Sequence, residues 1–232
     1  MIGRETPPPH RVRPPAEPQR IRRATGPLTD RGQARKAALL LAARRVFERK
    51  GFVDTRVADI VAEAKVAHGT FYTYFASKEA VFRAVAQDTV DDMLAALRAG
   101  GYPDDPQERV RVALRRFVEV YRLNARIIAL TEQAGTFSPE LRAMRLALRE
   151  AFVRRSARSI RRLQKEGIAD PGLNAVLTAE VLGAMVDQTC YVWFALARGF
   201  APDAVLEALA TTWARAIAVD GRHANRAPAR EV

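Results

Sequence analysis

Residues 55–78 read TRVADIVAEAKVAHGTFYTYFASK, and this stretch decides the fold. Its apolar residues recur at intervals of three and four, the spacing of one face of an α-helix. The pattern predicts two short helices joined by a three-residue turn, with another helix starting at Ser77. The buried faces of the two short helices are formed by Val57, Ile60, Val61 and Ala64, then by Val66, Phe71, Tyr74 and Phe75.

The outward face of the second short helix carries small or hydrogen-bonding side chains. These residues are His68, Gly69, Thr70, Tyr72 and Thr73. An ordinary solvent-facing helix would carry long charged side chains instead. A helix that presents short donors and acceptors on its first turns can enter the DNA major groove and reach base edges. The pattern therefore favours a helix-turn-helix, and the alternative is a surface helix with no partner.

A longer stretch, from Arg35 to Phe82, resembles the DNA-binding domain of the TetR family of transcriptional regulators. The resemblance rests on residues at fixed spacing and without gaps: Phe47, Gly51-Phe52, Asp59-Ile60, residues 69–75 and Ser77-Lys78-Glu79. The resemblance implies an all-α protein with an N-terminal three-helix DNA-binding domain and a larger helical domain for ligand binding and dimerisation. It also implies a homodimer, a double-stranded DNA operator and a small-molecule effector.

The resemblance assigns DNA contacts to particular residues. Tyr72 and Lys78 match the family's phosphate-contacting positions. A phosphate beside Lys78 would also satisfy the free amides of a helix start, and the alternative is an exposed lysine. The other expected DNA-binding residues are Thr55, Arg56, Lys65, His68, Gly69, Thr70 and Thr73.

Three residues depart from the family pattern, which has Ser or Thr at Arg56, Gly at Lys65 and Ser at Ala67. Ala67 removes a side-chain cap from the recognition helix, at a cost of about 1 kcal/mol. A left-handed backbone at Lys65 would cost a further ~1–2 kcal/mol for a residue other than glycine. Arg56 cannot cap, so the preceding Thr55 is the candidate cap. Arg56 and Lys65 either exchange helix stability for phosphate attraction or are neutral drift.

Positive charge is concentrated near the predicted DNA-binding domain. The chain of 232 residues has a formal net charge of +12. Residues 1–83 contain 17 basic and 8 acidic residues, a balance of +9, whereas residues 84–232 contain 21 and 18, a balance of +3. This distribution is typical of a phosphate-binding module attached to a near-neutral module. The alternative is a generally arginine-rich chain.

The composition argues against an enzyme and against metal or cofactor sites. The single cysteine, Cys190, excludes an internal disulfide and lies in an apolar run, where a thiol is normally inert. His10, His68 and His223 lack metal-ligand spacing. No glycine-rich phosphate loop or nucleophile elbow is present in the sequence. We therefore expect no catalytic residue, no metal and no cofactor.

The sequence predicts neither export nor membrane insertion. The N-terminus is rich in proline and arginine, unlike a signal peptide. The longest apolar stretch, residues 181–197, is interrupted by Asp187 and Gln188 and is too short for a confident membrane span. We expect a cytoplasmic protein without a membrane partner.

Composition and periodicity divide the chain into four regions. The expected regions are a disordered basic arm rich in proline and arginine (1–28), a helix-turn-helix domain (29–82), a helical effector-binding and dimerisation domain (83–220) and a polar tail (221–232). Within the arm, Arg20, Arg22 and Arg23 either enter a minor groove beside the main site or add only non-specific attraction.

The periodicity beyond residue 103 remains helical, without a strand pattern or an internal repeat. Helices are predicted at residues 105–122, 125–136, 139–166, 173–198 and 202–220. The 173–198 helix is apolar on two faces, which indicates burial on two sides. The resemblance implies that the last two helices pair with a second copy, although their apolar surface fits an intrachain core equally well. The candidate interface residues are Leu182, Val186, Leu206, Leu209, Trp213 and Ile217.

Aromatic and sulfur-containing residues of the second domain are candidates to line an apolar ligand cavity, and ordinary core packing is the alternative for each. The candidates are Phe117, Tyr121, Phe137, Met144, Phe152, Met185, Cys190 and Trp193. Few charged residues lie along the 173–198 helix, so we expect a mostly apolar ligand. Arg122, Arg126 or Glu132 would meet its polar end.

These observations predict a ligand-responsive transcriptional regulator, acting as a repressor that an apolar small molecule releases from a palindromic operator. The alternative is a non-specific architectural DNA-binding protein, which would share the basic charge. Such a protein would not need a near-neutral helical domain about twice the size of its DNA-binding module.

Overall fold

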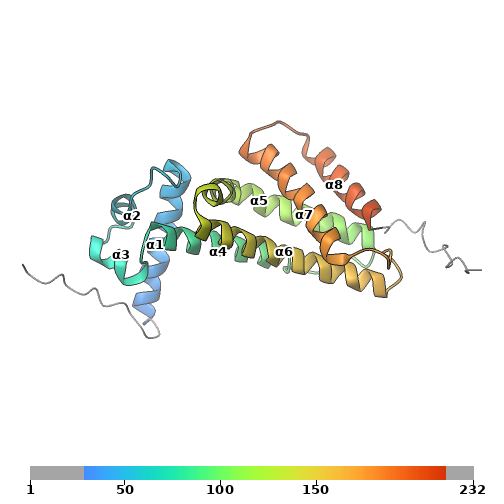
Figure 1. The fold of residues 1–232 in the computed structure, drawn as a ribbon, viewed down its shortest axis with the longest axis horizontal. Coiled ribbons are helices and arrows are strands. Elements are labelled where there is room, and N and C mark those ends of the chain that lie inside the picture. Colours follow the sequence, from blue (N-terminus) through green and yellow to red (C-terminus); the bar gives the residue numbers. More distant parts are fainter. Residues whose placement is uncertain (1–28, 218–232) are drawn as a thin grey trace, which may run out of the picture.

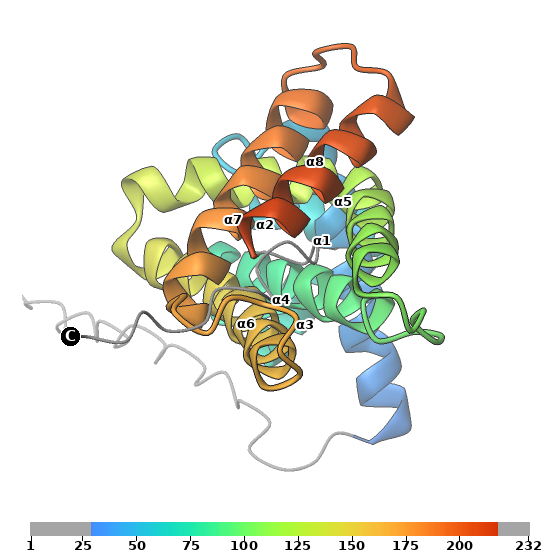
Figure 2. The same cartoon turned by 90° about the vertical axis from the view of Figure 1, so that its right-hand side faces the viewer.

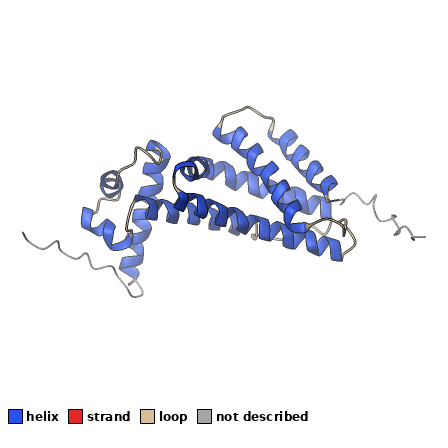
Figure 3. Ribbon diagram, in the orientation of Figure 1, coloured by secondary structure: helices blue, strands red, loops and turns tan. Residues whose placement is uncertain are grey.

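Helices form every regular element of residues 29–217, the part of the chain that the computed structural model describes (Figure 3). The predicted tail and the arm with Arg20, Arg22 and Arg23 lie outside the described residues. The all-α prediction is confirmed within the described range. The elements are α1 (Asp30–Lys50), α2 (Val57–Glu63), α3 (His68–Tyr74), α4 (Lys78–Ala96), α5 (Pro106–Phe137), α6 (Pro139–Lys165), α7 (Ala175–Cys190), the π-helical turn η1 (Tyr191–Ala195) and α8 (Pro202–Ala216).

Two groups of helices meet along α4 and α5 (Figure 1). Helices α1, α2 and α3 gather at one end of the molecule, and α4 leads from them into the bundle formed by α5 to α8. Within the bundle, α5 packs against α4, α6 and α8, and α6 packs against α7. Figure 2 shows α7 and α8 above α4 and α6. The boundary predicted between residues 82 and 83 falls inside α4, which is continuous between the two groups.

Polar side chains just before most helices satisfy free amides of the first turn. Each of these residues accepts a hydrogen bond from an amide two or three positions later: Thr29, Ser77, Asp105, Ser138 and Asn174. At the other end of α1, Gly51 has a φ of 80°, a left-handed conformation that glycine adopts at little cost, and it ends the helix. The two helices of the helix-turn-helix, α2 and α3, lack such a side-chain cap.

The predicted boundaries of two later helices are wrong. The helices predicted at 105–122 and 125–136 are one continuous helix, α5. No glycine or proline lies between residues 107 and 134, and the side chain of Asn124 donates a hydrogen bond to the Val120 carbonyl at 2.8 Å within the helix. The helix predicted at 173–198 is shorter at both ends. Asn174 caps the start of α7, and the left-handed backbone of Ala197, with a φ of 55°, follows the end of η1.

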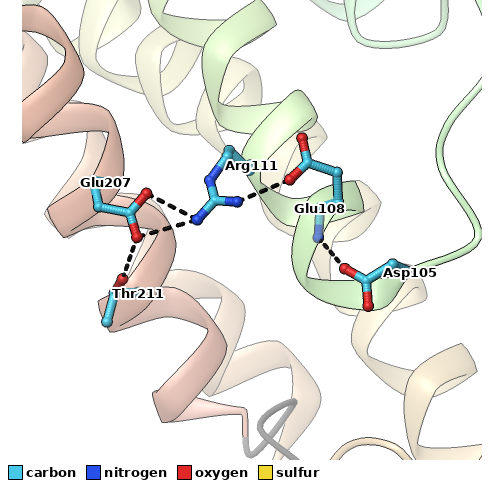
Figure 4. Close-up of polar contacts among 5 residues, drawn as sticks. All are labelled: Asp105, Glu108, Arg111, Glu207 and Thr211. Carbon is cyan, nitrogen blue, oxygen red and sulfur yellow. Dashed lines mark hydrogen bonds and ion pairs between the residues drawn. The ribbon is translucent and has the colours of Figure 1, made fainter.

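An arginine on α5 holds α8 in place (Figure 4). Nη2 of Arg111 donates to both carboxylate oxygens of Glu207, at 2.8 and 3.1 Å, while Nη1 donates to Glu108 at 2.8 Å. The Thr211 hydroxyl also donates to Glu207, at 3.1 Å. These side chains are partly exposed, so the network fixes the orientation of α8 more than it raises stability.

The core beneath the three N-terminal helices extends into the bundle. Phe47 of α1, Phe71 of α3 and Phe82 of α4 are fully buried in one cluster. The rings of Phe47 and Phe82 meet edge to face, with centroids 5.0 Å apart. Ile127 and Leu130 of α5 belong to the same cluster. Because such cores are close-packed, a shift of α5 must change the packing beneath α3.

Candidate DNA-binding surface and ligand cavity

Helix α3 has a buried side and a solvent-facing side. Phe71 is fully buried beneath it, while His68 and Gly69 are exposed. Tyr72 packs its ring edge to face with His68, with centroids 5.4 Å apart. Thr73 donates its hydroxyl to the Gly69 carbonyl at 3.4 Å. The predicted base-facing residues, with the partly exposed Thr70, therefore share one accessible surface of α3. The buried Phe71 anchors the opposite side of the helix in the core.

The turn between α2 and α3 is built from residues that do not favour it. Lys65 is exposed and has a φ of 53°, the left-handed region that costs a residue with a Cβ about 1–2 kcal/mol. Ala67 precedes α3 and offers no side-chain cap. Both departures from the family pattern therefore weaken the turn, as the sequence predicted.

Asp59 supplies the hydrogen bond that the start of α2 needs. Its carboxylate accepts the backbone amide of Arg56 at 2.9 Å and an ion pair from Lys50 at 2.7 Å. The Lys50 hydrogen bond, followed by the Arg56 amide, lowers the pKa of Asp59. Arg56 itself remains exposed beside this helix start.

Thr55 does not have the predicted role. Its side chain is buried, and its hydroxyl donates to the Gly51 carbonyl at 2.6 Å, which closes the loop after α1. The side chain therefore neither caps α2 nor offers a surface to DNA. The Thr55 hydroxyl gives the Gly51 carbonyl a hydrogen-bond partner, and an unpaired buried carbonyl would destabilise the fold.

Lys78 anchors the first turn of α4 to the loop after α1. Its ammonium donates to the carbonyls of Phe52 and Val53, at 2.8 and 3.1 Å. The same nitrogen lies 4.6 Å from the centroid of the Phe52 ring. An ammonium has three donors, so one remains for a phosphate oxygen. The predicted DNA contact of Lys78 stays a prediction.

A cavity of about 550 Å³ lies within the bundle. Its walls come from α4, α5, α6, α7 and α8 and are mostly apolar. On α6 the wall runs from Arg145 to Leu163, a span of about 27 Å at 1.5 Å per residue. The cavity is therefore long and narrow, a shape that suits a linear molecule better than a compact one.

Only some of the predicted ligand residues line this cavity. Phe117, Tyr121 and Phe152 do. Four others pack elsewhere in the core and do not reach the wall: Met144, Met185, Cys190 and Trp193. The side chain of Phe137 lies outside the described residues. Of the charged residues expected at a polar end, Glu132 lines the cavity, whereas Arg122 and Arg126 do not.

The predicted dimer residues are covered within a single chain. The buried members are Leu182, Val186, Leu209 and Ile217, and the partly buried Leu206 and Trp213 pack against the same clusters. Val186, Trp213 and Ile217 in fact line the cavity. The apolar surface that α7 leaves open is formed by Leu177 and Val181, each 61% exposed. A dimer contact of Leu182 or Val186 stays a prediction, because these side chains are already buried within one chain.

One end of the cavity is polar. Tyr121, Glu132 and Asp187 meet there, with Arg145 and Arg149 from α6. Burial, reinforced by the Glu132 carboxylate, raises the pKa of Asp187. Burial and then the charge of Asp187 raise the pKa of the Tyr121 phenol. Both Asp187 and Tyr121 are therefore harder to ionise than the same groups in open solvent.

The thiol of Cys190 lies close to this polar end without lining it. Cys190 is fully buried, and burial followed by the charge of Asp187 raises its pKa to about 12. The thiolate is the reactive form of cysteine, so this residue is an inert packing group at neutral pH.

Sequence reasoning missed the residues of α7 that face the cavity. Ala179, Gly183, Val186 and Asp187 share one helical face and line the wall. A Cβ added at Gly183 would meet no atom within 4 Å, so this glycine borders open space. The spacing of the four residues was available in the sequence, but small and acidic residues gave no apolar signal.

Comparisons with known proteins agree with this arrangement. Residues 39–85 match the family model "Bacterial regulatory proteins, tetR family", and residues 110–218 match "Transcriptional regulator EthR, C-terminal domain". The HTH-type transcriptional regulator EthR of Mycolicibacterium smegmatis is 30% identical over 197 residues, which cover 80% of this chain and 87% of that protein. The chain belongs to the TetR family of transcriptional regulators.

Other members of the TetR family resemble the chain over similar lengths. EthR of Mycobacterium tuberculosis is 27% identical over 195 residues, which cover 82% of this chain and 90% of that protein. Among solved structures, the fatty acid degradation regulator FadR from Bacillus halodurans has a TM-score of 0.67 at 17% identity, covering 77% of this chain and 94% of that one. A TetR-like regulator from Rhodococcus sp. RHA1 has a TM-score of 0.61 at 23% identity, covering 79% and 96%.

Family membership makes this chain a DNA-binding transcriptional regulator. TetR-family regulators bind DNA and small-molecule effectors and work as dimers. Their role is regulatory rather than enzymatic. Among residues 29–217, no helix is both long and apolar enough to cross a membrane.

Proposed function

We propose that this TetR-family protein represses transcription from a palindromic operator and leaves it when an elongated, mostly apolar molecule occupies the cavity. The observation that carries the proposal is the position of α5. Phe117 and Tyr121 of this helix line the cavity, while Ile127 and Leu130 pack in the core beneath α3. One rigid element therefore borders both the ligand space and the DNA-binding group.

DNA recognition is assigned to the exposed side of α3. The proposal gives base contacts to His68, Gly69, Thr70 and Thr73, all at least partly exposed, and a phosphate contact to Tyr72. Lys65 and Arg56 add exposed positive charge beside them. An operator complex with these contacts requires that α3 enter the major groove along its open face.

A second α3 must meet the second half of a palindrome, which requires a dimer. We assign the dimer surface to the open face of α7 around Leu177 and Val181, in place of the residues covered within one chain. Exchanging both for glutamate should give a folded monomer in light scattering. Leu146→Glu, at a residue of α6 that is 56% exposed, is the matched control and should leave the dimer intact.

Selection of bound sequences from a random DNA pool tests the proposed operator. The selected sequence should contain two inverted half-sites, and its binding should persist against an excess of random duplex. Unselective binding that random duplex removes completely would instead support a non-specific architectural protein. That outcome would contradict the proposed function.

A further inference from the structure

The charged residues at the polar end of the cavity are unequally paired. Arg145 donates to Glu132 with Nε at 2.7 Å. Arg149 donates to the Glu180 carboxylate at 2.5 Å and to the Glu180 carbonyl at 3.2 Å. Asp187 has only a distant ion pair, with Oδ2 at 4.0 Å from Nη1 of Arg149. The three carboxylates outnumber the two guanidinium groups, and Asp187 is the one without a close cation.

A largely buried tyrosine lines the same cavity as Asp187. Tyr121 is 1% exposed and lines the cavity. Within the part of the chain that the structure describes, its hydroxyl takes part in no hydrogen bond. The oxygen is open to the cavity, since Arg116 Nη1 is the only enclosed side-chain nitrogen or oxygen without a partner among the described residues. A phenol oxygen that opens on a cavity can take a ligand group as its hydrogen-bond partner. The oxygen can accept a hydrogen bond as well as donate one.

We propose that the ligand of this cavity carries a cationic amine head, held between the Asp187 carboxylate and the Tyr121 hydroxyl, on a linear apolar body. The ammonium group supplies the close positive charge that Asp187 lacks and donates to the phenol oxygen. The apolar body then lies along α5 and α6 between Phe117, Phe152 and their neighbours.

The aromatic rings and the route of access favour the same head group. Phe117, Tyr121 and Phe152 form a chain of ring contacts along the wall, with centroids 5.8 Å apart at each step. Of the three, Tyr121 belongs to the proposed head-group site, where an aromatic ring can attract a cation. On its outer side, Asp187 also borders a second hollow lined by Gln133 and Gln188. Asp187 therefore borders both the main cavity and this second hollow.

An anionic head fits the Asp187 end of the cavity less well, because both arginines at that end are occupied. Arg145 and Arg149 hold carboxylates at short range. Towards the other end of the cavity, Arg109 donates to the Pro103 carbonyl at 2.9 Å, and Arg155 donates to the Leu97 carbonyl at 2.6 Å. At the Asp187 end, a carboxylate ligand would have to displace the contact of Arg145 or Arg149 and would stand close to Asp187.

This inference rests on the proposed ligand role of the cavity, and three probes of equal chain length separate the two claims. Decylamine, decan-1-ol and decanoate are titrated into the full-length protein by calorimetry. Decylamine should bind the wild type about ten- to hundred-fold more tightly than decan-1-ol, the range expected for hydrogen bonds to a charged group. Asp187→Asn should remove this preference and leave the alcohol affinity unchanged.

Two variants complete the design. Tyr121→Phe keeps the ring and should weaken decylamine several-fold while decan-1-ol binds as before. Asp203→Asn removes an exposed carboxylate of α8, outside the cavity, and should change no affinity. Circular dichroism of each variant checks that it folds, and the wild-type comparison of head groups stands without any variant.

The head-group proposal is overturned if decylamine and decan-1-ol bind the wild type equally, if decanoate binds most tightly, or if folded Asp187→Asn keeps the amine preference. Alcohol binding that displaces DNA without any amine preference would leave the proposed function standing and remove only the head group. Failure of all three probes to bind would contradict the ligand role of the cavity itself.

Discussion

Arg44 of α1 donates a hydrogen bond from Nη2 to the side-chain carbonyl of Asn124 on α5, with the two atoms 2.5 Å apart. Asn124 is only 6% exposed, and its amide nitrogen is bound to the Val120 carbonyl at 2.8 Å. Arg44 also pairs with Glu48 at 3.0 Å. A buried polar contact therefore joins the DNA-binding group to the helix that borders the cavity.

Asn124→Ala should destabilise the protein by about 1–3 kcal/mol, because the partly buried guanidinium of Arg44 loses the partner that Asn124 provides. The free energy of unfolding in urea measures this loss. Leu123→Ala alters the neighbouring residue, which is 66% exposed, and should change stability by less than about 0.5 kcal/mol. Equal effects of the two variants would show that the contact contributes nothing specific.

Lys65→Gly should stabilise the protein by about 1 kcal/mol, because glycine removes the strain of a left-handed backbone. Lys65→Ala is the control, since it removes the same charge but keeps a Cβ in that conformation. Urea unfolding of both variants separates strain from charge. If alanine stabilises as much as glycine, the strain at Lys65 is not the cause.

Lys78→Ala should lower the slope of log affinity against log salt by about one unit, the share of a single phosphate contact. It should also lower the free energy of unfolding, because the ammonium ties α4 to the carbonyls of Phe52 and Val53. Lys165→Ala, at the exposed far end of α6, should change neither quantity. If the salt dependence of DNA binding is unchanged in Lys78→Ala, the lysine makes no phosphate contact and has only its structural role.

The sequence predicted the DNA-binding half of this protein better than the ligand-binding half. Aromatic residues at fixed spacing, such as Phe47 and Phe71, indicate the core of the N-terminal helices, and the glycine at residue 51 marks a helix end. The cavity depends on which face of α7 turns inward, and its two faces are similar in hydrophobicity. Asp187 was noted only as an interruption of an apolar run, because its importance arises from Tyr121, 66 residues earlier in the chain.

Gly183→Leu should block the cavity while leaving operator affinity unchanged. The face that carries Gly183 lines the cavity, and an added Cβ meets no atom, so a larger side chain can occupy ligand space without a clash. Decan-1-ol should bind this variant at least about ten-fold more weakly in calorimetry, a loss of about 1.4 kcal/mol. Gly183→Ala should keep ligand binding and gain about 0.5–1 kcal/mol of stability as a helical residue. Normal decan-1-ol binding to the leucine variant would place the ligand elsewhere.

Coupling between ligand and operator is measured most directly by two reciprocal titrations. The selected operator is titrated with and without a saturating cavity ligand, and the ligand is titrated with and without operator. We predict that each weakens the other by the same factor, about 5- to 150-fold for a coupling of roughly 1–3 kcal/mol. Identical operator affinity with the cavity empty and filled would contradict ligand control of this regulator.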